Sequence, residues 1–290
     1  MPRPTARLLL LAFSLICSSL TAAAAEPLTG TLKAIRDRGV VVIGHVKDAN
    51  LMSFVGADGQ PAGYSVDLCR AIAEDAAKAA GLPQAKIQYV PVTLDNRFDM
   101  VASGKVDIEC ATSTITLGRM EKVDFTNMTF VSGGTLLVRR GSGIHGVVGL
   151  VDETVAVIPG TTTEKALQAA LDKKFVKAKV VPVKDHREGI AALEAGKVGA
   201  YASDRIILIG LLVESGQLDK FGLAEEQFSY EPYGFMVRRN DADFRLVANR
   251  TLARLYRSGE VLKVFQRWFG KLGDPSPALA AMYLMNSTPE

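Results

Sequence analysis

The segment VPVTLDNRFDMVASGKV at residues 90–106 returns in similar form at residues 181–198 as VPVKDHREGIAALEAGKV. Each copy ends a strand-like run, passes through a polar loop into a helical pattern, and stops at Gly-Lys-Val before another strand-like run. Their prolines are 91 positions apart and their glycines 92, so the second copy has one extra residue in its helical part. Unless these common strings recur by chance, the repeat predicts two similar halves.

Outside the repeat, short apolar runs continue to alternate with helical patterns. The expected strands are 40–43, 87–92, 106–110, 154–158, 180–183 and 200–202. The expected helices are 66–80, 98–102, 164–174, 188–195 and one that runs through Leu212. Strands that alternate with helices build mostly parallel sheets covered on both faces, so the sequence predicts an α/β fold.

Length and composition describe an ordinary globular protein with room for about two domains. The 290 residues are 48% hydrophobic and 22% charged, which argues against a disordered or fibrous chain. Lys and Arg number 34 against 31 Asp and Glu, a formal net charge of +3. This charge is too small to predict a nucleic-acid partner.

The first 25 residues have the pattern of a secretory signal peptide. Arg3 and Arg7 precede an apolar run at 8–16, and small residues at 21–25 follow it. We expect cleavage near Ala25, because the run is too short to span a bilayer and no stop-transfer pattern follows. A retained anchor is the alternative, and a lipoprotein at Cys17 is disfavoured by the bulky residue before it.

Export would place the two remaining cysteines, Cys69 and Cys110, in an oxidising compartment. They can form a disulfide there or stay as two buried thiols, and the sequence leaves both possibilities open. They lack the close spacing of zinc or redox pairs. We expect no metal and no cofactor.

Polar residues follow the expected strands, where the loops of two open parallel sheets would face a cleft between them. These loops are 95–97, 112–114, 160–164, 185–187 and 203–204. In the third loop, Thr161 and Glu164 have the spacing of a capping box, and the uncapped N–H groups of that helix start attract an anion.

Charged residues in or near these loops can bind a zwitterion. Arg119, five residues beyond Thr114, can reach back into the cleft and hold a carboxylate with a two-pronged contact, and Asp204 can hold an ammonium group. Hydroxyl and backbone donors around the carboxylate would come from Thr112, Thr114, Thr161 and Thr162. Alone, Thr161 and Asp204 could be plain helix caps and Arg119 a solvated surface charge. Together they predict a site for a free amino acid.

Several stretches resemble the periplasmic solute-binding proteins of polar amino-acid ABC transporters, family 3. They are GVVVIG (39–44), AGYSVDL (62–68), IT (115–116) followed by Arg119 and VDFT (123–126), GTT (160–162) and YGFMVR (233–238). The resemblance implies a two-lobed periplasmic-binding-protein fold of type II, with the ligand cleft between lobes joined by two crossing strands. The crossings would lie near 136–140 and 228–233. One lobe would hold 26–137 and 231–290, and the other 138–230.

The resemblance also implies roles for individual residues. Arg119, Thr112, Thr114 and Thr161 or Thr162 would hold the α-carboxylate, and Asp204 the α-ammonium group. The chain is most similar to the glutamate/aspartate-binding branch, in which Arg97 and His186 would contact the side-chain carboxylate. Val46 departs from this branch, which usually has an Arg there. Ala49 and Asn50 replace the aromatic residue of relatives that bind basic amino acids.

The implied function is the periplasmic amino-acid-binding component of an ABC importer, a monomer that closes over its ligand and delivers it to an inner-membrane permease. The alternative is a cyclohexadienyl or arogenate dehydratase, since such enzymes share this fold. Glu109, His186 or Asp95 could then act as the general acid. The complete zwitterion set and the absence of common catalytic motifs argue against an enzyme.

Overall fold

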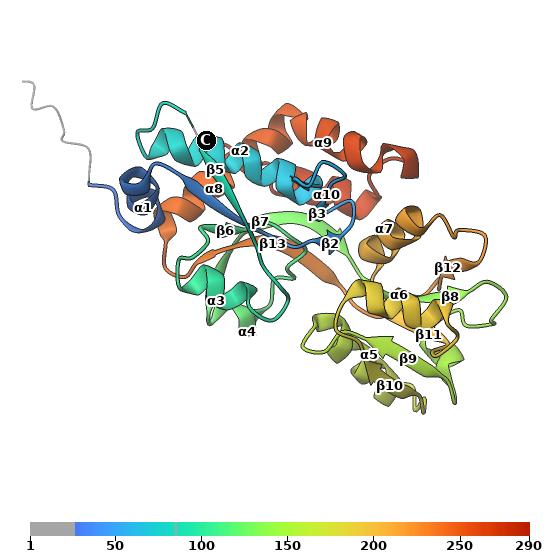
Figure 1. Ribbon diagram of the computed structural model, residues 1–290. Coiled ribbons are helices and arrows are strands. Elements are labelled where there is room, and N and C mark those ends of the chain that lie inside the picture. The colour runs from blue at the N-terminus through green and yellow to red at the C-terminus, as the bar shows by residue number, and fades with distance from the viewer. Residues whose placement is uncertain (1–26, 85) are drawn as a thin grey trace, which may run out of the picture.

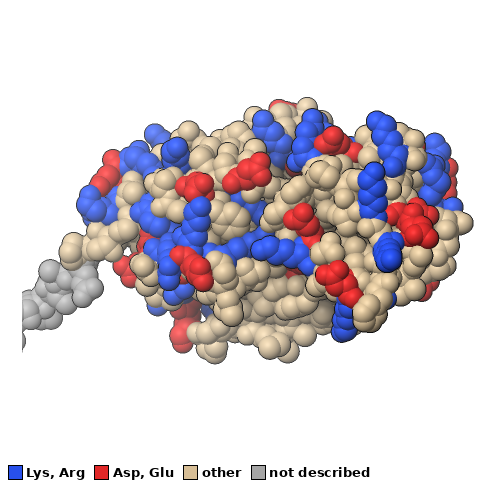
Figure 2. Space-filling model, turned by 90° about the horizontal axis from the view of Figure 1, so that it is seen from below, with Lys and Arg blue, Asp and Glu red and all other residues tan. Residues whose placement is uncertain are grey.

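The computed structural model describes residues 27–84 and 86–290, and the expected signal peptide lies outside the described residues. Two five-stranded sheets, each covered by helices, form two lobes that lie side by side (Figure 1). On the face shown in Figure 2, positive and negative side chains are interspersed over both lobes, as expected for a nearly balanced charge.

The two sheets have the same arrangement. Three parallel strands are followed by a fourth strand antiparallel to the third, and the fifth strand is antiparallel to the fourth. In order, the first sheet holds β5 (Ile87–Pro91), β1 (Val41–His45), β6 (Ile108–Glu109), β13 (Glu231–Arg238) and β7 (Val123–Ser132). The second holds β10 (Lys179–Pro182), β9 (Thr154–Val157), β11 (Ala200–Asp204), β8 (Gly134–Arg139) and β12 (Phe221–Leu223). The prediction of an α/β fold with mostly parallel core strands is confirmed.

The repeated segment occupies equivalent places in the two lobes. The first copy runs from the end of β5 through α3 (Arg97–Ala102) to the residues just before β6, and the second runs from the end of β10 through α6 (His186–Glu194) to the residues just before β11. Each copy thus connects the edge strand of its sheet to the third strand, with β1 or β9 between them. Because parallel strands end at the same edge of a sheet, the loops after them converge.

Other helices cover the sheets, and a small sheet lies beside the first lobe. The first lobe has α1 (Gly30–Arg38), α2 (Tyr64–Ala79), α4 (Leu117–Met120), α8 (Ala242–Ser258), α9 (Glu260–Phe269), the 3-10 turn η2 (Gly270–Leu272) and α10 (Pro277–Met285). The second has the 3-10 turn η1 (Val147–Leu150), α5 (Thr162–Lys173) and α7 (Arg205–Ser215). The small sheet is β2 (Asp48–Ala49), β3 (Ser53–Val55) and β4 (Pro61–Ala62).

The chain changes lobes twice. It leaves the first sheet at the end of β7 and enters the second at Gly134, so the first crossing is at Gly133. The expected boundary after residue 137, and a crossing at 136–140, therefore differ from the structure. The reason is that β8 pairs along its length with β11, from Gly134 opposite Asp204 to Val138 opposite Ala200. The chain returns between β12 and β13.

Alternating side chains of the second sheet enter two apolar cores. On β8, Leu136 and Val138 pack into a cluster with Leu167 of α5. Leu137 points to the other face and joins a core that continues into the first lobe. This alternation is the two-residue period of a strand that is covered on both faces.

A disulfide joins Cys69 of α2 to Cys110, directly after β6, with 6.2 Å between the Cα atoms. Of the two possibilities left open by the sequence, the structure has the bridge. It fixes a covering helix to the strand that leads into Thr112 and Thr114.

Candidate functional site

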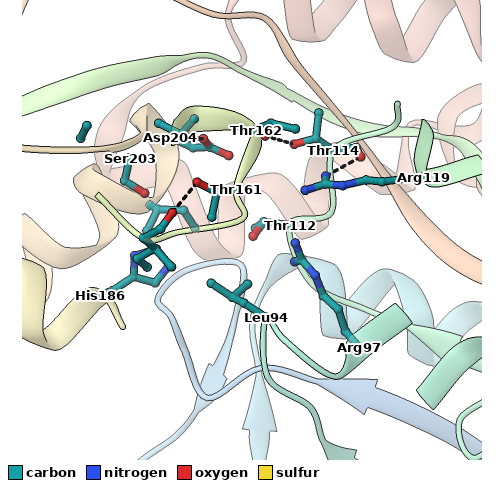
Figure 3. Close-up of a pocket in the computed structure, with 14 residues that line it drawn as sticks. Leu94, Arg97, Thr112, Thr114, Arg119, Thr161, Thr162, His186, Ser203 and Asp204 are labelled. Carbon is teal, nitrogen blue, oxygen red and sulfur yellow. Dashed lines mark hydrogen bonds between the residues drawn. The ribbon is translucent and has the colours of Figure 1, made fainter. Parts of the chain in front are cut away.

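A cavity lies between the lobes, where the carboxyl ends of the parallel strands of both sheets meet (Figure 3). The first lobe contributes Leu94, Arg97, Thr112, Thr114 and Arg119 to its lining. The second lobe contributes Ile158, Thr161, Thr162, Thr163, His186, Ala202, Ser203, Asp204 and Ile207. All eight side chains that the sequence predicted for a ligand site are therefore brought to one cavity.

Two short loops aim the first side chains of α3 and α6 at this cavity. Before α3, Thr93 N–H donates to Asn96 Oδ1 at 2.9 Å, and Asn96 N–H donates to Thr93 Oγ1 at 3.3 Å. Before α6, Asp185 caps the helix by accepting from the N–H of Glu188 at 2.8 Å. Such side-chain bonds fix where a helix begins. They determine the positions of the first residues, Arg97 and His186.

The N-terminus of α5 also faces the cavity. Thr161 is its N-cap and accepts from the N–H of Glu164 at 3.1 Å, as the capping-box spacing predicted. The Glu164 carboxylate accepts in return from the N–H of Gly160 at 2.7 Å. The following residues, Thr162 and Thr163, present the positive end of a helix dipole beside the two arginines.

Arg97 is a buried cation, with 4% of its surface exposed. Its guanidinium lies 5.3 Å from the centre of the Phe98 ring. Among the described residues its buried Nε has no hydrogen-bond partner. Burial lowers the pKa of Arg97, and the nearby carboxylate of Glu109 partly offsets this effect. A buried arginine with an unused donor is suited to an anionic ligand.

The guanidinium of Arg119 lies 5.4 Å from the centre of the same Phe98 ring. Figure 3 shows both arginines at the cavity. Its Nη1 donates to the carbonyl oxygen of Thr114 at 2.7 Å, which holds the side chain against the loop after β6. Burial and repulsion by Arg97 lower the pKa of Arg119 to about 10. Two cations thus face one cavity, an arrangement that favours anionic groups.

Asp204 lies at the N-cap position of α7, yet its side chain does not cap the helix. Its carboxylate instead accepts hydrogen bonds from the hydroxyls of Thr163 and Tyr233. Burial, and then the charge of Glu231, raise the pKa of Asp204 to about 6. Asp204 is therefore not a plain helix cap. Its carboxylate is a buried acceptor on the cavity wall.

His186 is a buried neutral group on the second-lobe side. Its Nδ1 lies 2.7 Å from the hydroxyl oxygen of Tyr201, which fixes the ring. Burial lowers the pKa of His186 and raises that of Tyr201, so both are uncharged near neutral pH. With one ring nitrogen engaged, the other can serve a ligand.

A profile of the bacterial extracellular solute-binding proteins, family 3, matches residues 41–271 of the chain. The chain belongs to this family. The L-glutamate/L-aspartate-binding protein of Pseudomonas aeruginosa is 35% identical over 263 residues, which cover 90% of this chain and 87% of that protein. The glutamate/aspartate import solute-binding protein of Escherichia coli K12 is 31% identical over 261 residues, covering 90% and 86%.

A solved structure agrees with this membership. An ancestral amino-acid-binding protein, described as a precursor of cyclohexadienyl dehydratase, superposes with a TM-score of 0.71 at 30% identity, covering 83% of this chain and all of that structure. The predicted family and the two-lobed fold are confirmed. As a family 3 protein, the chain is an extracytoplasmic solute-binding protein that works with a transporter. The prediction of a binding protein rather than an enzyme is confirmed by these relatives.

Some side chains that bond to the site residues of this solute-binding protein had no predicted role. Thr163 and Tyr233 donate to Asp204, and Glu231 accepts from Thr114 and Thr162 at 2.6 and 2.7 Å. Thr163 and Ser203 belong to the expected cleft loops 160–164 and 203–204, and both line the cavity. The sequence held one signal for Glu231, a carboxylate at the predicted second crossing. The partners of these side chains are distant in sequence, so no local pattern reveals them.

Val46 does not line the cavity. It is buried and lies in a wider groove that continues outward between the lobes, together with Lys47 and Lys184. The groove and the cavity share Leu94 and Ile158. The departure from the acidic-ligand pattern at Val46 therefore leaves the arginine pair of the cavity intact.

Two further properties bear on chemistry. Among residues 27–84 and 86–290, no three His, Cys, Asp or Glu side chains cluster as metal ligands would. In the same part of the chain, no helix combines the length and apolar character needed to cross a bilayer.

Proposed function

We propose that this chain is the amino-acid-binding component of an ABC importer and that its ligand is a free acidic amino acid, glutamate or aspartate. The observation that carries the proposal is the Arg97 guanidinium, buried at the cavity with an unpartnered Nε and with Arg119 beside the same aromatic ring. Two cations suit a ligand with two carboxylates. The names of the two relatives support the same ligands.

The backbone end of the ligand would be held by both lobes. Arg119 would bind the α-carboxylate, assisted by Thr112 and Thr114 of the first lobe and by Thr161 and Thr162 at the N-terminus of α5. Asp204 would bind the α-ammonium group as its ionised form. This division is favoured because a helix N-terminus and an arginine attract an anion, while a buried carboxylate attracts a cation.

The side-chain end of the ligand would lie toward Arg97 and His186. Arg97 would contact the second carboxylate as a charged donor, and the neutral His186 would add a hydrogen bond. An amide side chain would gain less from Arg97, because it is neutral and offers one acceptor oxygen, whereas a carboxylate is an anion that can accept both prongs of the guanidinium. We therefore propose that Arg97 sets the preference for acidic over neutral amino acids.

Closure of the lobes would bring the two halves of this set together. The open protein would offer the ligand one lobe's contacts, and the closed protein both, so ligand binding would favour closure. We propose that a monomer, located in the periplasm after removal of residues 1–25, delivers the ligand to an inner-membrane permease.

A thermal-shift panel tests this function. The chain from residue 26 is freed of bound ligand by unfolding and refolding, and is then heated with each free amino acid. We expect L-glutamate and L-aspartate to raise the midpoint most, because a ligand bound only to the folded state stabilises it. An absence of any shift with all amino acids, together with turnover of prephenate or arogenate, would contradict the proposal and favour the dehydratase.

A further inference from the structure

β13, the first-lobe strand that follows the second crossing, contacts the second lobe through two side chains. Glu231 and Tyr233 are two positions apart, so they point to the same face of the strand. Glu231 is 1% exposed and Tyr233 is fully buried. Each forms a hydrogen bond with a residue of the second lobe, Glu231 with Thr162 and Tyr233 with Asp204.

The Glu231 carboxylate accepts hydrogen bonds from hydroxyl groups of both lobes. Its Oε2 accepts from Thr114 Oγ1 of the first lobe at 2.6 Å and from Thr162 Oγ1 of the second at 2.7 Å. Its Oε1 accepts from Ser229 Oγ at 2.6 Å, and that hydroxyl oxygen accepts from the N–H of Gly134 at 2.8 Å. One buried carboxylate thus ties together both lobes and both crossings.

The hydroxyls of Thr114 and Thr162 have one hydrogen each, and both hydrogens go to Glu231. The 3.3 Å between their oxygens is therefore a contact across the cleft rather than a further hydrogen bond. Hydrogen bonds to an ionised group are among the stronger ones in proteins. The bond from Thr162 exists only while the N-terminus of α5 lies against β13.

Tyr233 makes the second link. Its ring stacks on Phe130 of β7 at a centroid distance of 6.2 Å, which fixes it within the first lobe. From there its hydroxyl donates to Asp204 at the start of α7. The two links from β13 therefore end on two of the second-lobe helix starts that line the cavity, those of α5 and α7.

We propose that Glu231 and Tyr233 form a latch between the lobes that shifts the equilibrium between the open and closed forms toward closure, and that Glu231 is a positioning residue for closure rather than a contact of the ligand. The latch favours the closed form in both the free and the bound protein. Because apparent affinity scales with the population of the binding-competent form, the latch strengthens all ligands by one common factor. It contributes nothing to the choice among them.

Solution scattering of the ligand-free chain from residue 26 tests the latch directly. Glu231→Gln removes the charge and keeps the shape, and Tyr233→Phe removes one hydroxyl and keeps the ring stacking. Both variants should expand relative to the parent protein, seen as a larger radius of gyration. Glu226→Gln is the control, because the Glu226 carboxylate is bonded to Lys174 and Val147 within the second lobe alone. This control should scatter like the parent.

Calorimetric titration with L-glutamate, L-aspartate and L-glutamine supplies the second readout, and this arm rests on the proposed function. Glu231→Gln should weaken every amino acid that binds by a common factor of about tenfold, within the usual range for coupled equilibria. Unchanged scattering, equal expansion of the Glu226→Gln control, or a loss confined to acidic ligands would each overturn the latch. If no amino acid binds the parent, the proposed function fails while the scattering still decides the latch.

Discussion

Asp204 has two requirements that oppose each other. As a proposed partner of an ammonium group it must be ionised, yet burial and the charge of Glu231 raise the pKa of Asp204 to about 6 from 3.8. The unfolded chain holds this proton less tightly, so ionisation of the folded form lowers stability. This loss of stability is therefore absent below pH 3.8, grows between pH 3.8 and pH 6, and is complete above pH 6. It amounts to about 3 kcal/mol.

The affinity for an acidic amino acid should therefore depend on pH. Below about pH 6 the proton competes with the ligand's ammonium group for Asp204, so the dissociation constant should rise by up to about tenfold for each unit of decrease. His186 stays neutral near neutral pH because burial lowers its pKa. Calorimetric titration of L-glutamate between pH 8 and pH 5 measures the dependence.

Asp204→Asn provides the comparison. It should bind weakly and without this pH dependence, while its ligand-free form should gain about 1–3 kcal/mol of unfolding free energy at pH 7, since a strained buried charge is removed. A parent affinity that is flat between pH 7 and pH 5, or an equal slope in the variant, would contradict the role of Asp204.

At this scale, the chemistry of the residues around the predicted cleft indicated Arg119 and Asp204 for the site, and the family resemblance added Arg97 and His186. All four line the cavity. Glu231 was not predicted, because its importance depends on contacts with Thr114 and Thr162, which lie more than 60 positions away. Such contacts exist only after the lobes have folded and met.

Among the elements, α7 determines how closely the lobes can approach. Gly210 is buried within this helix, and an added Cβ would lie 2.6 Å from the carbonyl oxygen of Asn50, in the turn between β2 and β3. A second contact joins the same elements, because Asn50 Nδ2 donates to Glu214 at 3.2 Å. The helix of one lobe thus touches the backbone of the other, and glycine makes that approach possible.

Gly210→Ala should separate stability from binding. Alanine is favoured over glycine in a helix by about 1 kcal/mol, so the unfolding temperature of the ligand-free chain should be unchanged or higher. The methyl group would overpack the closed form by about 1–3 kcal/mol, which should weaken ligand affinity by about 5- to 150-fold. Thermal unfolding of the ligand-free chain and titration with L-glutamate measure the two effects.

Gly118→Ala is the matched control, because a Cβ at Gly118 meets no atom within 4 Å. It should bind like the parent. Parent-like affinity in Gly210→Ala would mean that α7 does not meet the turn at Asn50 in the ligand-bound state.

Most elements could be predicted from the sequence, since buried parallel strands and amphipathic helices have clear patterns. The repeat at 90–106 and 181–198 predicted two similar halves, and the structure has each copy lead from the edge strand of its sheet to the third strand. The first crossing was wrong by a few residues. β7 and β8 are one nearly continuous strand-like run that Gly133 divides between two sheets, and hydropathy does not change at that point.

For the whole molecule, the two lobes supply complementary halves of one site. The first lobe brings the cations Arg97 and Arg119, and the second brings Asp204 and the N-terminus of α5. Under the proposed function, neither half alone would hold both ends of an amino acid. High affinity should therefore require the closed form, while Arg97 should determine which ligand side chain is preferred.

The affinity of the intact chain for L-glutamate and L-glutamine, compared with that of Arg97→Ala, tests this account most directly. The two ligands differ at one side-chain position, where glutamate has a carboxylate oxygen and glutamine has an amide nitrogen. We expect Arg97→Ala to weaken L-glutamate by about 3 kcal/mol or more and L-glutamine by less than about 1 kcal/mol, because only glutamate would leave a buried carboxylate without its cation. Equal losses for the two ligands would contradict the account and make Arg97 a structural residue.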